Sequence, residues 1–246
     1  MQRSIARGSS LPRPVAASIV AVLLACAAAA WYLTLKQSSA MDMGGGLAMM
    51  GAGVFLVTWV VMMVAMMFPS VAPMVLAHAS VVRSRGEGVL PSVAFVAGYL
   101  VVWTSAGLVP LAVIQLLNSS LGMSLGGWLP RLGGTVIVLA GLYQLTPLKD
   151  ACLKACRSPL GFVLTHDFGG GSVSAVRAGA THGLYCLGCC WALMAVLAVL
   201  GLMNIAWMAA FAVLFFLEKN WRSGVQLAKA VGVFCIVGGL LVIAIG

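Results

Sequence analysis

The stretch "WVVMMVAMMFPSVAPMVLAH" (Trp59–His78) runs for twenty residues without a charged side chain. About 20 predominantly apolar residues are what a helix needs to cross the hydrocarbon core of a bilayer. The whole chain shares this character, since 62% of its 246 residues are hydrophobic and 8% are charged. A soluble domain carries about a quarter charged residues. The sequence therefore predicts an integral membrane protein.

Further apolar runs lie on both sides of this stretch. Unpaired backbone groups are costly in lipid, and no alternating pattern indicates a barrel, so the runs predict helices. The predicted fold class is all-α, a polytopic transmembrane helical bundle that forms a single domain over residues 1–246. About seven helices are expected, over residues 15–35, 47–78, 90–117, 129–148, 178–202, 204–217 and 225–246. The first run has spanning length, which favours a retained helix over a cleaved signal.

The fifth and sixth runs are separated by "GLMN" (Gly201–Asn204), where we expect a tight hairpin. The sixth run is the shortest of the seven. Joined to the fifth it would make a helix about twice as long as the hydrocarbon core is thick. Two helices with a turn between them are therefore the better prediction.

Lysine and arginine predict the orientation of the bundle. With the N-terminus in the cytoplasm and the C-terminus outside, all but two of the 14 basic residues fall on the inner side, the exceptions being Lys36 and Arg131. Cytoplasmic loops of membrane proteins carry such an excess. The net charge of +9 is scattered over short loops. It therefore indicates the lipid bilayer as partner, and no nucleic acid.

The segment "HGLYCLGCCW" (His182–Trp191) places a histidine and three cysteines in the fifth predicted helix. His182, Cys186 and Cys190 are spaced i, i+4 and i+8, and Cys189 is at i+7, so all four project from one stripe. Imidazole and thiolate are ligands that suit Cu(I) and Zn(II). One helix can offer two or three of these groups to one ion, so a second segment is needed.

Two other segments offer sulfur. In the second predicted helix, methionines follow one another at helical spacing: Met62, Met63, Met66 and Met67. Pro69 and Pro73 in the same helix remove backbone donors, which is common where a membrane helix lines a site. In the predicted inner loop "PLKDACLKACRSP" (Pro147–Pro159), Cys152 and Cys156 are spaced i, i+4. Because soft ligands dominate, Cu(I) is the predicted ion, with zinc as the alternative.

Three of these motifs together resemble a known group of proteins. "MMVAMMFPS", "PLKDACLKACRSP" and "HGLYCLGCCW", in that order, are similar to an uncharacterised bacterial family of predicted metal-binding integral membrane proteins. The resemblance implies a multi-pass protein of the bacterial inner (cytoplasmic) membrane. It also implies a metal site at the motif positions Met62, Met63, Met66, Met67, Cys152, Cys156, His182, Cys186, Cys189 and Cys190.

Three functions fit these residues. The leading one is a protein that binds Cu(I) for uptake or for delivery to a copper chaperone or an oxidase under assembly. The second is a thiol–disulfide redox conduit built on the CxxC pair of Cys186 and Cys189. The third is a structural subunit of a larger membrane complex, in which the sulfurs only fill space. No phosphate loop, HExxH or GxSxG motif is present, so we do not expect an enzyme.

Overall fold

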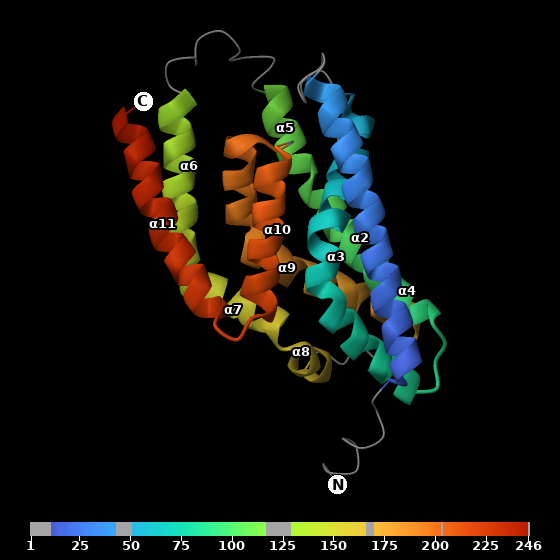
Figure 1. Cartoon of the computed structure of the whole chain (residues 1–246). Helices are drawn as coiled ribbons and strands as arrows, with labels where there is room; N and C mark the ends of the chain where they lie inside the picture. The colour runs from blue at the N-terminus through green and yellow to red at the C-terminus, as the bar shows by residue number, and fades with distance from the viewer. Residues whose placement is uncertain (1–10, 43–50, 117–128, 166–169, 203, 246) are drawn as a thin grey trace.

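The computed structural model describes residues 11–42, 51–116, 129–165, 170–202 and 204–245, and within these ranges it is built from helices without a strand. The all-α prediction is confirmed. Figure 1 shows most of the helices running along one direction. In chain order they are α2 (Arg13–Asp42), α3 (Ala52–Ser84), α4 (Leu90–Ala106), α5 (Leu108–Leu116), α6 (Leu129–Gln144), α7 (Pro147–Arg157), α8 (Pro159–Thr165), α9 (Gly171–Gly201), α10 (Ile205–Asn220) and α11 (Gly224–Ile245).

The number of membrane-length helices in the described chain differs from the seven predicted. Five helical stretches are long and apolar enough to cross a membrane: α2, α3, α4 with α5, α9 and α11. A sixth arises only if α6 and α7 count as one span, and these two are bent by 66° at the break between Gln144 and Pro147. Helix α10 has 16 residues. That is just below the range of about 17–25 residues that crosses the hydrocarbon core.

The break inside the predicted helix 129–148 has a local cause. Pro147 has no backbone N–H and stands at the first position of α7, where helices tolerate proline. The Thr146 hydroxyl accepts a hydrogen bond from the Lys149 backbone N–H at 3.3 Å and caps the new helix. The chain therefore ends one helix and starts another. The segment with Cys152 and Cys156, predicted as a loop, is helix α7.

One further predicted helix boundary differs from the structure, and another agrees with it. Helix α9 begins at Gly171, seven residues before the predicted 178, because its first turns are polar and a hydropathy pattern does not register them. The predicted hairpin does separate α9 from α10: Gly201 has φ of +111° and Asn204 caps α10 through its side chain. Residues 47–50, 117, 203 and 246 of the predicted elements lie outside the described ranges.

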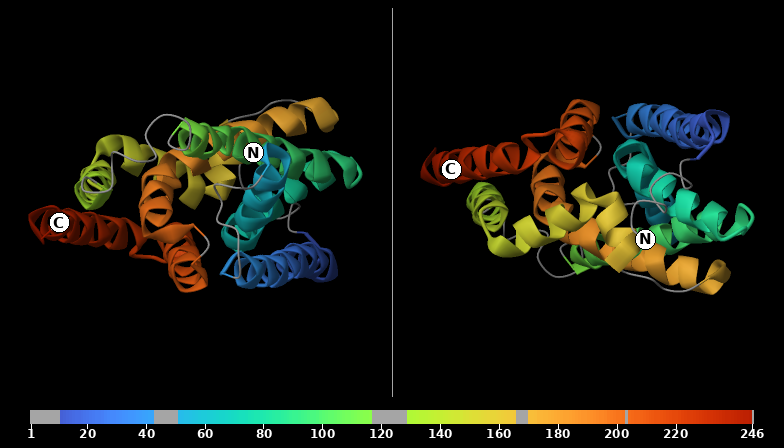
Figure 2. Two further views of the ribbon diagram at one scale, coloured as in Figure 1. Left: turned by 90° about the horizontal axis from the view of Figure 1, so that it is seen from above. Right: turned by 90° about the horizontal axis from the view of Figure 1, so that it is seen from below.

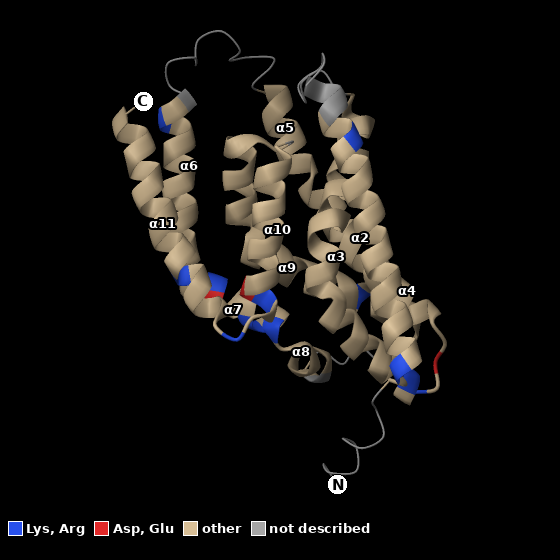
Figure 3. Ribbon diagram, in the orientation of Figure 1, with Lys and Arg blue, Asp and Glu red and all other residues tan. Residues whose placement is uncertain are grey.

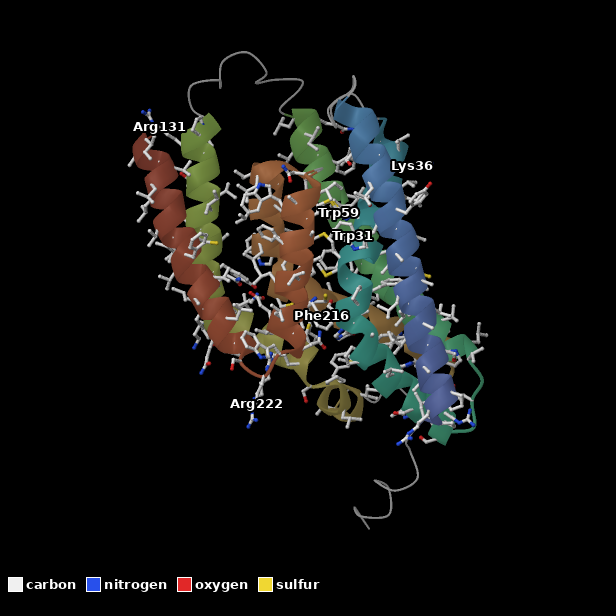
Figure 4. The ribbon with its side chains drawn as sticks, in the orientation of Figure 1. Trp31, Lys36, Trp59, Arg131, Phe216 and Arg222 are labelled. Atoms are coloured by element: carbon white, nitrogen blue, oxygen red, sulfur yellow. The ribbon has the colours of Figure 1, made fainter. Side chains whose placement is uncertain are left out.

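The helices form two groups with α9 and α10 between them. Figure 2 shows α6 and α11 side by side at one edge, and α2, α3 and α4 at the other. Tryptophans attach the neighbours of α3 to it: Trp31 Nε1 donates to the Ala65 carbonyl at 3.1 Å, and Trp59 Nε1 donates to the Trp103 carbonyl at 2.8 Å (Figure 4). The methionine-rich helix α3 is thereby fixed in the interior.

Basic side chains gather at one end of the bundle. Figure 3 shows most of the lysines and arginines near α7, α8 and the turn between α3 and α4. Lys36 and Arg131 lie at the opposite end (Figure 4). Helix α2 starts at the basic end and α11 finishes at the other (Figure 1). The two ends of the bundle thus differ in charge as the sequence predicts.

Glycines bring α4 and α9 into backbone contact. A Cβ atom added at Gly179 would overlap the Phe95 carbonyl oxygen, and one added at Gly98 would overlap the Val176 carbonyl oxygen. Small residues allow this close approach between membrane helices. The contact holds the aromatic face of α4 against the sulfur-bearing face of α9.

We expect Gly179→Ala to destabilise the protein by about 1–3 kcal/mol, because the overlapping atom belongs to a backbone that cannot move alone. Thermal unfolding in detergent measures the loss. Gly238→Ala in α11 is the matched control, since its Cβ would meet nothing within 4 Å. Equal unfolding temperatures for the two variants would show that the α4–α9 contact tolerates a methyl group.

Candidate metal centre

Three cysteine sulfurs converge in the interior. Cys156 comes from α7, and Cys186 and Cys189 come from α9. Their Sγ atoms all lie within 4.8 Å of one another, and those of Cys156 and Cys189 are 3.8 Å apart. A metal ion binds thiolate sulfur at about 2.3 Å, so two ligands of one ion lie up to about 4.6 Å apart. These three residues, called the thiol cluster below, are therefore at or near ligating separation.

Hydrogen bonds to α9 and α10 hold this part of the chain in place. Arg157 of α7 donates to the carbonyl oxygen of Glu218 on α10 at 2.6 Å, and Tyr143, near the end of α6, donates to the Gly188 carbonyl on α9 at 2.6 Å. Leu153 is fully buried between these ends. The helix thus lies across α9 with Cys156 facing the Cys186–Cys189 turn.

The other two predicted cysteines lie beside the thiol cluster. Cys190 Sγ is 3.8 Å from Cys189 Sγ, but it donates to the Cys186 carbonyl at 2.6 Å. Cys152 is partly buried and touches α9 at Gly188, where an added Cβ would come within 2.7 Å of its sulfur. Neither belongs to the three sulfurs that share one centre. Their roles as ligands stay predictions.

A lysine lies directly at the thiol cluster. The Lys219 ammonium, on α10, donates to Cys186 Sγ at 3.1 Å, to Ser70 Oγ at 3.4 Å and to Met67 Sδ at 3.5 Å. The Tyr99 hydroxyl is also 3.1 Å from Cys186 Sγ. A buried ammonium is costly unless an anion is close. The sulfur of Cys186, as thiolate, is the negative partner that this geometry offers.

A second buried lysine belongs to a separate network. Lys149 donates to the Cys189 carbonyl oxygen and forms a salt bridge with Glu218 at 2.7 Å. Gln144 donates to the other carboxylate oxygen at 3.1 Å. Because Glu218 is bonded to Lys149, it is not the counter-charge of its neighbour Lys219. The network holds the backbone of Cys189 in place through its carbonyl oxygen.

The sequence patterns did not single out these buried charges. Lysines near helix ends are typical of the headgroup region. In the structure Lys149 is 0% exposed and Lys219 is 6% exposed. Spacing offered one clue, since Lys149, Leu153 and Cys156 follow at i, i+4 and i+7 on one face of α7. The length of α10 offered a second clue. A helix of 16 residues is short for a membrane span, so a lysine near its end can lie inside the bundle.

The predicted methionine ligands are all in the interior of α3. Met62, Met63, Met66 and Met67 are each at most 1% exposed. Met67 is connected to the thiol cluster through Lys219, which bonds its sulfur and that of Cys186. The structure therefore brings one of the four next to the cysteines through a shared partner. The ligand role of the other three stays a prediction.

His182 precedes Cys186 by one helical turn and is 2% exposed. It is surrounded by aromatic rings, with centroid distances of 5.3 Å to Phe162, 6.0 Å to Tyr99 and 6.1 Å to Phe95. It lies outside the three-sulfur centre. A direct bond to the same ion would need a change of side-chain conformation.

The fold and this site define a class: an all-helical protein, rich in helices of membrane length, whose interior holds a cluster of soft ligands. A comparison of the sequence with family profiles agrees, because the profile of the PpoB2 family, described as a copper chaperone, matches residues 56–242. The chain belongs to the PpoB2 copper chaperone family. The match covers α3 to most of α11 and includes every predicted ligand. No curated protein and no solved structure matches the chain.

Proposed function

We propose that this protein is an integral membrane copper chaperone whose single transmembrane domain holds Cu(I) on the thiol cluster. The observation that carries the proposal is the convergence of three cysteine sulfurs from two helices within 4.8 Å, beside a buried ammonium. Membership of a copper chaperone family supports the choice of ion. Thiolate and thioether ligands select Cu(I) over harder ions. The ion would pass to a copper-requiring partner, such as an oxidase under assembly or a second chaperone.

Charge and coordination favour Cu(I) over the alternative, zinc. Cu(I) on two thiolates carries one net negative charge, which the Lys219 ammonium cancels. Structural zinc is almost always bound by four ligands. The cluster offers three sulfurs to one centre, and the groups at 3.1 Å from Cys186 Sγ are the Tyr99 hydroxyl and the Lys219 ammonium, which cannot bind a metal while protonated.

Replacement of any cysteine of the thiol cluster by serine is expected to lower copper retention at least about ten-fold, because one charged soft ligand is worth several kcal/mol in a dry site. The variants are Cys156→Ser, Cys186→Ser and Cys189→Ser. Met67→Leu, which keeps apolar volume, should lower retention less. Copper and free thiols are measured per chain after purification under reducing conditions.

Two cysteines away from the thiol cluster serve as controls for this assay. Cys26 on α2 is exposed, and Cys235 on α11 is buried without belonging to the three-sulfur centre. Cys26→Ser and Cys235→Ser should retain copper as the wild type does. Equal losses of copper in all five cysteine variants would argue against a defined thiol site.

The thiol–disulfide alternative also has a structural observation in its favour. The 3.8 Å approach of Cys156 and Cys189 joins different helices, whereas the predicted pair of Cys186 and Cys189 lies on one helical face. Thiol exchange needs both sulfurs of a pair. A redox conduit would therefore show reversible loss of two free thiols in a wild type that holds no copper.

For the orientation we propose the N-terminus in the cytoplasm and the C-terminus outside, in a bacterial inner membrane. The concentration of basic side chains at the end that carries α7 and α8 supports it (Figure 3). A reporter fused after Gly246 is then expected to be active outside the cytoplasm. One inserted in the α3–α4 turn at Gly86 should be active inside. The reverse pattern would contradict this topology.

A further inference from the structure

Aromatic rings link the thiol cluster to the basic end of the bundle. His78 on α3 stacks on Phe95, Phe95 stacks on His182, and His182 stacks on Tyr99. The distances between ring centroids are 4.5 Å, 6.1 Å and 6.0 Å in that order. The Tyr99 hydroxyl then lies 3.1 Å from Cys186 Sγ. Two histidines thus alternate with two other rings along a column that ends at a candidate copper ligand.

The other end of the column borders a cavity. His78, Phe95 and Phe162 form part of its wall, and Arg85 and Glu87 stand in its lining at the α3–α4 turn. Phe95 and Phe162 also pack on His182, which is not among the residues that line the cavity. His78 therefore faces the cavity, and His182 lies just behind the aromatic wall.

Each histidine carries a ring nitrogen with no assigned use. His78 is 8% exposed and His182 is 2% exposed. In the described part of the chain, the buried Nδ1 atom of each has no hydrogen-bond partner. Buried polar atoms are normally paired, so such an atom needs an explanation. Neutral imidazole nitrogen is a common metal ligand and suits copper.

We propose that His182 and His78 are successive ligands on a transfer path for Cu(I) between the thiol cluster and the cavity. This inference rests on the proposed function and extends it from holding to release. Both imidazoles stack on the Phe95 ring, and they bind the ion in turn. Phe95 acts as the gate between them and must rotate aside for the second exchange.

Each step is a ligand exchange in which copper stays Cu(I). The bonds from copper to Sγ of Cys156 and Cys189 break first, the bond to Cys186 Sγ breaks as a bond to His182 nitrogen forms, and His78 nitrogen then replaces His182. A ligand of the acceptor in the cavity finally replaces His78. The Cys186 thiolate left behind keeps the Lys219 ammonium as its counter-charge, and the second thiolate takes up one proton when the ion leaves.

The test uses the purified full-length chain loaded with one equivalent of Cu(I) under reducing conditions. Release to a hydrophilic Cu(I) chelator, bathocuproine disulfonate, is followed by absorbance. His78→Phe keeps a ring on Phe95 but removes the ligand, and we expect it to slow release at least ten-fold with an unchanged copper content. His78→Met restores a soft ligand and should restore most of the rate.

Val81→Ala, in the same cavity wall, is the matched control and should release copper at the wild-type rate. Phe95→Leu, which removes the gate, should release faster, and it decides the question if His78→Phe does not fold. Unchanged copper release in His78→Phe, or in Phe95→Leu, would overturn the transfer path but not the proposed function. Release from His78→Met as slow as from His78→Phe would also overturn it, by showing a steric effect. A wild type that binds no copper would contradict the proposed function itself.

Discussion

Lys219→Met is expected to lower the affinity of the thiol cluster for Cu(I) by about a hundred-fold or more. Lys219 is the ammonium that bonds Cys186 Sγ, and methionine matches its length without its charge. Removing one partner of a buried ion pair typically costs about 3–5 kcal/mol, and each 1.4 kcal/mol is a factor of ten in a binding constant. Without the ammonium the cysteines stay protonated, and copper has to displace those protons.

Competition titration against a Cu(I) chelator at fixed pH measures this affinity. Lys154→Met, an exposed lysine of α7, is the matched control and should bind copper as the wild type does. Lys219→Arg keeps the charge and should recover part of the loss, although the larger guanidinium fits the site less well. Wild-type affinity in Lys219→Met would show that another group balances the charge of the thiolates.

The largest loss of folding stability is expected for Lys149→Met. Lys149 and Glu218 form a salt bridge of 2.7 Å with side-chain exposures of 0% and 2%. Without the lysine, Glu218 is left buried and unpaired, at a cost of about 3–5 kcal/mol. The unfolding temperature of the copper-free protein in detergent measures the effect.

Two comparisons separate this effect from a general sensitivity to lost lysines. Lys229 pairs with Asp150 at 3.8 Å, with exposures of 54% and 38%, so Lys229→Met should cost less than about 1 kcal/mol. Combining Lys149→Met with Glu218→Gln removes the unpaired charge and should recover part of the stability. If Lys149→Met unfolds at the same temperature as Lys229→Met, the buried bridge does not stabilise the fold.

Much of the fold could be predicted because long apolar runs favour helices of membrane length. Apolar length identified the helices, and the charge pattern separated the two ends of the bundle. Prediction failed where the chain turns inside the bundle. The length of an apolar run does not show that Pro147 starts a new helix, or that α10 ends after 16 residues.

The candidate site was predictable only along single helices. The i, i+3 spacing of Cys186 and Cys189 follows from helix geometry, whatever the rest of the fold does. That Cys156 joins them depends on how α7 folds across α9, which no local pattern encodes. Lys219 escaped notice for a different reason: a basic residue at the end of a membrane helix normally marks the lipid headgroups. Its contacts with Cys186 and Met67 reverse that expectation.

The most direct test of the account is the metal content and copper-edge X-ray absorption spectrum of the wild-type chain, purified in detergent under reducing conditions. The thiol cluster predicts about one copper per chain, as Cu(I), with sulfur neighbours at about 2.3 Å. The same measurement on the variant that lacks Cys156, Cys186 and Cys189 should show neither the copper nor the sulfur shell. Stoichiometric zinc without copper, or copper surrounded only by nitrogen and oxygen, would contradict a copper chaperone built on these three thiols.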